Sequence, residues 1–184
     1  ESWERQKDIK NVMLFLQGHG VSTAFAAKIY REYGKESIDK VQENPYRLAD
    51  DIWGIGFKTA DGIAFRMGYG KDDPRRCRSG ILYTLGQIAD EGHCFATEEQ
   101  LMGKAMDLLE VGGEAVSGVL GEMVEAGDVI KDGEDVYLPP FHHAECGAAR
   151  RILALRSGSG SLFSEPEPDL SHGGGIVYDE TQLE

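Results

Sequence analysis

The amino-acid sequence predicts a mainly α-helical protein: tandem helix-hairpin-helix units, then a small winged-helix-like α+β unit and a disordered C-terminal tail. Three observations lead to this fold class. The pattern G-[IV]-[GS]-x-x-x-A-x-x-I occurs at residues 20–29 and again, 34 residues later, at residues 54–63. Two helical patterns and an Asp-Gly turn between short β-forming runs follow within residues 98–138. Residues 157–175 are rich in Ser, Gly, Pro and acidic side chains, which is typical of a linker.

The first hairpin is predicted from an amphipathic pattern over residues 3–16. Its apolar stripe consists of Ile9, Val12, Met13 and Leu16. A turn at residues 17–20 leads to a helix that starts with Ser22 as its N-cap, reaches about Tyr33 and is stopped by Gly34. A short helix over residues 36–42 connects this hairpin to the second copy.

The second hairpin is predicted to begin at Asn44-Pro45, where an N-cap residue precedes a proline in the first helical position. This helix ends near Asp51, and its partner covers residues 57–67. Each copy of the pattern contains one alanine for close helix packing and one isoleucine for the core. These residues are Ala26 and Ile29 in the first copy, and Ala60 and Ile63 in the second.

Both hairpin turns are predicted to bind nucleic-acid backbone. Glycine permits a positive φ and a close approach to a partner, and free N–H groups at the start of a helix bind phosphate. The residues expected to supply turn shape and N–H donors are Gly20, Val21, Ser22, Gly54, Gly56, Phe57 and Lys58. The basic side chains near the turns are Lys28, Arg31, Lys58 and Arg66, of which Lys58 is best placed, in the opening turn of its helix. The alternative is that the turns only connect helices.

The second half is predicted to contain a helix over residues 74–90 and a Thr97 capping box that opens a helix to about residue 110. A helix that ends at Gly127 and a β-hairpin within residues 129–138 complete the winged-helix outline, and a last helix covers residues 142–155. The helix that ends at Gly127 exposes Glu114, Glu122 and Glu125, whose charges repel phosphate, so this unit is not expected to read DNA. The predicted domains are residues 1–70, 71–156, a linker at 157–175, and 176–184.

The net charge of −13 opposes tight binding to nucleic acid, because phosphate affinity depends largely on basic side chains. Residues 1–70 are balanced, with ten basic and ten acidic side chains, whereas residues 157–184 carry six acidic and no basic ones. The acidity therefore lies after the two hairpins. The densest basic cluster follows the second hairpin and consists of Lys71, Arg75, Arg76 and Arg78. Arg75, Arg76 and Arg78 would extend the DNA footprint; the alternative is a solvated helix start balanced by Asp72 and Asp73.

Other chemistry finds little support in the sequence. Three cysteines without a C-x-x-C motif favour a reducing cytoplasm, and we expect Cys77, Cys94 and Cys146 to be buried small residues. No apolar run reaches membrane-spanning length. His142-His143 with Cys146 has no fourth ligand and is not expected to bind a metal ion. The P-loop motif G-x-x-x-x-G-K-[ST] is missing.

The blocks Asn44–Leu48 (NPYRL), Gly54–Asp61 (GIGFKTAD) and Glu91–His93 (EGH) resemble the N-terminal region of RecD/TraA-type ATP-dependent DNA helicases. The resemblance covers residues 3–156. It implies a superfamily 1 enzyme that moves 5′ to 3′ on single-stranded DNA and acts in DNA repair or recombination. In that family this region precedes the motor domains.

Tyr178–Gln182 resembles the lead-in to the first motor domain, whose glutamine contacts the adenine of ATP. The resemblance therefore implies ATP and Mg²⁺ for the intact parent, with Gln182 as the one residue carried over for nucleotide. This sequence lacks the P-loop, the acidic Mg²⁺ motif and the arginine finger. We therefore expect the non-catalytic N-terminal part of a helicase that continues beyond this chain, with no cofactor of its own.

The leading hypothesis is an accessory region that holds DNA by its backbone, without sequence-specific readout, next to its own helicase motor. The alternative is a protein-interaction scaffold that docks a partner, or the motor, through the acidic second half. A stand-alone nuclease is disfavoured, because the sequence has no clustered carboxylate motif for metal binding.

Overall fold

The computed structural model describes residues 2–157, with side chains from residue 6 onward. The described residues up to His143 form one compact unit, and Ala144–Ser157 belong to a second. The mainly α-helical fold class is confirmed. Apart from Ser157, the predicted linker at residues 157–175 lies outside the described residues, as do the segment 176–184 and Gln182.

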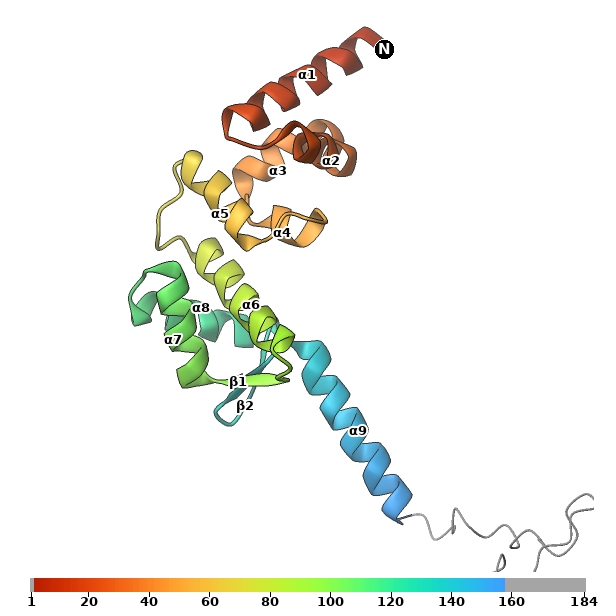
Figure 1. Ribbon diagram of the computed structural model, residues 1–184, viewed down its shortest axis with the longest axis vertical. Helices are drawn as coiled ribbons and strands as arrows, with labels where there is room; N and C mark the ends of the chain where they lie inside the picture. The colour runs from red at the N-terminus through yellow and green to blue at the C-terminus, as the bar shows by residue number, and fades with distance from the viewer. Residues whose placement is uncertain (1, 158–184) are drawn as a thin grey trace, which may run out of the picture. The chain divides into compact units, whose positions relative to one another are not determined.

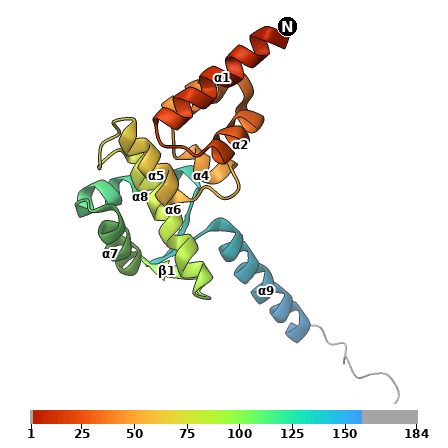
Figure 2. The same ribbon diagram turned by 45° about the horizontal axis from the view of Figure 1, so that its top comes forward.

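The first hairpin consists of α1 (Ser2–Gly18) and α2 (Thr23–Tyr33), which pack side by side in Figures 1 and 2. The Ser22 hydroxyl accepts the Phe25 N–H at 3.3 Å, so the predicted N-cap is present. Gly34 ends α2 with a φ of 59°, a conformation that a side chain would disfavour. A 3₁₀ turn, η1 (Gly34–Glu36), and α3 (Ser37–Glu43) then lead to the second copy.

The second hairpin consists of α4 (Arg47–Asp51) and α5 (Phe57–Arg66). The predicted helix start at Asn44-Pro45 is wrong by two to three residues. The Asn44 side chain instead accepts the Tyr46 N–H at 3.1 Å, and the backbone carbonyl of Asn44 accepts the Arg47 N–H at 3.3 Å. These two bonds make a turn that precedes the helix, because an Asx side chain competes with the backbone for local donors.

The second half contains α6 (Pro74–Asp90), α7 (Glu98–Leu109) and α8 (Gly113–Ala126), which pack together in Figure 1. The strands β2 (Ile130–Asp132) and β3 (Asp135–Tyr137) form the predicted β-hairpin. A third strand, β1 (Phe95–Thr97), pairs antiparallel with β3 and was not predicted. Three residues are too short for a recognisable alternation, and pairing with a distant strand decides their conformation.

The last helix, α9 (Pro139–Ser157), begins three residues before the predicted start, because two prolines suit the first helical turn. None of its described residues is buried. Cys77 is buried as expected, but Cys146 on α9 is exposed and Cys94 is half-buried. The prediction of three buried cysteines is therefore wrong for Cys146.

A single core runs from the first hairpin into the second half of the compact unit. The isoleucines and alanines of both copies of the repeated pattern are buried within it, as the pattern predicts. Core members contributed by the hairpins are Val12, Leu16, Ala26, Ile29, Leu48, Ala60 and Ile63; those from α6, α7 and α8 include Ile81, Leu85, Leu101, Leu109, Val116 and Met123.

The predicted domain boundary after residue 70 lies inside this unit and stays a prediction. Among residues 2–157, no helix is long and apolar enough to cross a bilayer.

Candidate nucleic-acid interface

The first hairpin turn presents a short row of open backbone donors. Gly20 has a φ of 78°, and the amides of Gly20 and Val21 are used inside the turn, bonded to the carbonyls of Gln17 and Leu16. The next three amides, of Ser22, Thr23 and Ala24, have no acceptor within the described part of the chain. Gly20 and the buried Val21 therefore set the shape of the turn, while the donors lie at the start of α2.

The second turn repeats this arrangement, but without a side-chain cap at the helix start. Gly54 has a φ of 95°, and Gly56 is the N-cap of α5 without any side-chain cap. The amides of Gly56, Phe57 and Lys58 have no acceptor among residues 2–157. The Phe57 ring is buried, whereas the Lys58 side chain is exposed beside these amides. Each turn therefore presents three amides without an acceptor in the described residues, the arrangement that binds anions at helix starts.

Basic side chains connect the two turns reciprocally. Lys28 of α2 donates from Nζ to the carbonyl of Trp53 in the second turn at 3.0 Å. Arg66 of α5 donates from Nη1 to the carbonyl of His19 in the first turn at 3.3 Å. Each turn therefore has a cation from the opposite hairpin beside it, a feature that follows from packing and that the repeat alone does not encode.

Acidic groups also lie close to the turns. Asp50 shares a hollow of about 230 Å³ with Gly56 and Phe57, and burial raises the pKa of its carboxyl group. Glu32 and Asp51 line a second hollow with Lys28 and Trp53. Since these carboxylates repel phosphate, they offset the cations beside the turns, and phosphate binding would depend mainly on the amides.

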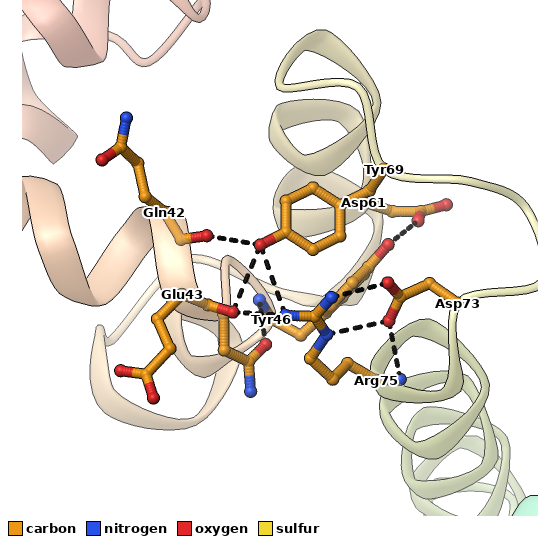
Figure 3. A network of polar contacts seen from close by, with 8 residues as sticks. Gln42, Glu43, Tyr46, Asp61, Tyr69, Asp73 and Arg75 are labelled. Atoms are coloured by element: carbon orange, nitrogen blue, oxygen red, sulfur yellow. Dashed lines mark hydrogen bonds and ion pairs between the residues drawn. The ribbon is translucent and has the colours of Figure 1, made fainter.

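The predicted basic cluster after the second hairpin is engaged with acidic partners. Arg75 forms two bonds to the Asp73 carboxylate, at 2.7 and 2.9 Å, and donates to the carbonyl of Glu43 (Figure 3). Lys71 pairs with Glu110 at 2.6 Å, and Arg78 pairs with Asp128. Arg75 therefore pairs with the expected Asp73. Lys71 and Arg78 pair instead with acidic residues farther along the chain. Lys71, Arg75 and Arg78 stay exposed, so their role as DNA contacts stays a prediction.

Arg76 differs from the rest of the cluster, because only 4% of this residue is exposed. Its guanidinium donates to both oxygens of Asp61 on α5, at 2.8 and 3.1 Å. It also donates to the carbonyls of Lys71 and Leu109, at 2.8 and 2.7 Å. Arg76 therefore joins the second hairpin to α7, and its donors are used inside the protein.

Tyr46 connects this network to the start of the second hairpin. Its hydroxyl donates to Asp61 Oδ1 at 2.9 Å (Figure 3). Burial and this hydrogen bond raise the pKa of Tyr46, so the hydroxyl remains a donor. Tyr46 lies in the NPYRL block and Asp61 in the GIGFKTAD block, so the two blocks meet through Tyr46 and Asp61. The sequence contained both residues, but only folding shows that they are partners of Arg76.

The Asp73–Arg75 pair should make stability depend on pH. The hydrogen bonds from Arg75 lower the pKa of Asp73, so the ionised form stabilises the fold. This contribution is complete above the unfolded pKa of about 3.9 and disappears as the pH falls through the lower folded pKa. We expect Asp73→Asn, which keeps an N-cap for α6, to lose less stability between pH 7 and pH 3 than the unmodified protein.

Urea unfolding at pH 7 and pH 3 measures this difference. The matched control is Glu122→Gln, which removes an exposed carboxylate of α8. An equal acid dependence for Asp73→Asn and the unmodified protein would contradict the assigned role of Asp73.

Trp53 was missed by sequence reasoning. It directly precedes the turn glycine Gly54 and is 89% exposed. The signal available in the sequence was a large aromatic residue within a tight turn between two helices, where burial is difficult.

In the part of the chain that the structure describes, no group of three His, Cys, Asp or Glu side chains is arranged to hold a metal ion.

Comparison with known proteins identifies the family of the N-terminal half of the chain. Residues 5–95 match the family model described as the ATP-dependent RecD2 DNA helicase HHH domain. The ATP-dependent RecD2 DNA helicase of Deinococcus radiodurans is 32% identical over 96 residues, which cover 51% of this chain and 13% of that protein. The resemblance inferred from the sequence is confirmed for residues 5–95, which belong to the helix-hairpin-helix domain family of RecD2-type ATP-dependent DNA helicases.

Proposed function

We propose that the tandem hairpins hold DNA by its backbone as the non-catalytic accessory region of an ATP-dependent 5′–3′ DNA helicase. The observation that carries this proposal is the pair of turns with open helix-start amides, each with a basic side chain from the opposite hairpin beside it. Family membership of residues 5–95 supports it. Contacts of this kind position DNA without reading its sequence.

For the whole protein we propose DNA repair or recombination as the setting, with ATP and Mg²⁺ as the cofactors of the motor. ATP would supply the energy for translocation there. The task proposed for this chain is to bind and orient DNA for that motor. The matched residues make up only 13% of the relative. The motor, its cofactors and its setting are therefore proposals for the whole protein.

Fluorescence anisotropy of labelled single-stranded and forked DNA, at low and moderate salt, tests the proposal. We expect saturable binding that weakens steeply with salt. Lys58→Glu should weaken binding about tenfold or more, because it removes a cation and places an anion beside the open amides of α5.

Lys104→Glu is the matched control, since it makes the same change in net charge on α7, where Lys104 pairs with Glu91. This variant should bind DNA nearly as well as the unmodified protein. Equal weakening by both variants would mean that net charge alone controls binding. Absence of binding at low salt would overturn the proposal for this chain.

A protein-interaction scaffold is the second candidate, favoured by two features outside the hairpins. The helix α9 exposes Ile152, Leu153 and Leu155, and α8 exposes acidic side chains at Glu114 and Glu122. In this case the hairpins would be structural connectors. Lys58→Glu would then leave the function unchanged, whereas substitutions on α9 would abolish docking of the partner or the motor.

A further inference from the structure

Trp53 is the most exposed large hydrophobic side chain among the described residues, at 89%. The other large apolar side chains with high exposure are Leu14, Phe65, Phe95, Ile152, Leu153 and Leu155, at 39–67%. An indole normally buries a large apolar area and contributes strongly to core or interface energetics. Because the Trp53 side chain is not packed into the core, its indole is available to a ligand.

The indole is held in place from one side. Lys28 Nζ lies 5.1 Å from the centroid of the Trp53 ring and donates to the Trp53 carbonyl at 3.0 Å. The same amine lies 5.5 Å from the centroid of Phe25. The cation–π contact and the hydrogen bond fix the residue at both its ring and its backbone. An ordered and exposed aromatic surface loses little conformational entropy when a ligand stacks on it.

The surroundings of Trp53 are charged and not apolar. A hollow of about 400 Å³ is lined by Lys28, Arg31, Glu32, Asp51, Ile52 and Trp53. Four of these six residues are charged, whereas the core of a protein–protein interface is depleted in charged residues. The open amides of Gly56, Phe57 and Lys58 begin only three residues after Trp53.

A nucleotide has the matching combination of groups, namely a planar π-face and a nearby phosphate. A base can stack on the indole while the adjacent phosphate meets the open amides and the cations. In a continuous duplex, both faces of a base are covered by its neighbours. The indole can therefore receive only a base that is unpaired or lies at a junction or end.

We propose that Trp53 is a base-stacking platform for an unpaired nucleotide, which gives the second hairpin a preference for single-stranded or forked DNA over continuous duplex. This inference rests on the proposed function, since the same turn must hold the adjacent phosphate. Stacking of this kind tolerates any sequence, because every base has a π-face.

The first test compares a single-stranded oligonucleotide with a closed duplex of the same charge, both by anisotropy with the full 184-residue chain. Trp53→Ala should weaken binding to the single strand about 5- to 100-fold and leave duplex binding unchanged. Trp53→Phe should restore part of the loss, because a smaller ring still stacks. Phe95→Ala, which removes another exposed ring on β1, is the matched control and should alter neither affinity.

The second test removes the bases and keeps the phosphates. An abasic oligonucleotide of equal length should bind the unmodified protein as weakly as the normal single strand binds Trp53→Ala. The sequence contains two tryptophans, so Trp3→Phe leaves Trp53 as the only indole. Its fluorescence should be quenched by the normal oligonucleotide and not by the abasic one.

The outcomes separate this inference from the proposed function. If the abasic and normal strands bind equally and Trp53→Ala has no effect, while Lys58→Glu still weakens binding, then base stacking is refuted and backbone binding stands. If no DNA binds at low salt, both are refuted. A loss with Trp53→Ala that is equal for single strand and duplex would also refute stacking, because it would indicate a general change in the turn.

Discussion

Arg76→Ala is expected to destabilise the protein by about 3–5 kcal/mol, the usual result of removing one partner from a buried ion pair. The Arg76 guanidinium forms a fork with the two oxygens of Asp61 and reaches two backbone carbonyls, those of Lys71 and Leu109. Its removal leaves the Asp61 carboxylate, whose side chain is only 14% exposed, without its cation. Urea unfolding monitored by circular dichroism measures the loss.

Lys104→Ala is the matched control for Arg76→Ala, because it breaks the Lys104–Glu91 pair, in which both side chains are more than half exposed. A surface pair of this kind contributes about 0–1 kcal/mol. If the two variants were destabilised equally, the contact between the second hairpin and α7 would not depend on Arg76. A specific loss would show that one member of the predicted DNA-binding cluster acts mainly in folding.

Gly20→Val is expected to destabilise the first hairpin by about 1–3 kcal/mol, the cost of a residue with a side chain in the left-handed region. The φ of Gly20 is 78°. In addition, a Cβ atom at this position would lie 1.6 Å from Nη1 of Arg66, so the arginine must leave the carbonyl of His19. The variant should therefore show a lower thermal midpoint and weaker DNA binding.

Gly62→Ala is the control, because this change is expected to raise the stability that Gly20→Val lowers. Gly62 lies inside α5, is exposed, and a Cβ there would meet no atom within 4 Å. Alanine at this position should stabilise the helix by about 0.5–1 kcal/mol. A thermal midpoint that fell for Gly62→Ala, or stayed constant for Gly20→Val, would contradict the conformational roles assigned to these two glycines.

Local signals in the sequence were sufficient for most helices and turns. Thr97 and Gln100 form the expected capping box at the start of α7, and Gly127 ends α8 with a φ of 79°. Caps, turn glycines and helical periodicity act over a few residues, so their effect hardly depends on the rest of the chain. The duplicated hairpin pattern was readable for the same reason, because both copies contain complete turn and packing signals.

The sequence by itself determined the tandem hairpins, the order of the helices and the β-hairpin of the second half. Only the tertiary structure decided that Arg76 is buried against Asp61 and that Lys28 and Arg66 reach the opposite turns. It also decided that β1 pairs with β3 and that the indole of Trp53 stays in solvent. The physical reason is distance along the chain: these contacts join residues 15–47 positions apart, and burial depends on which surfaces meet.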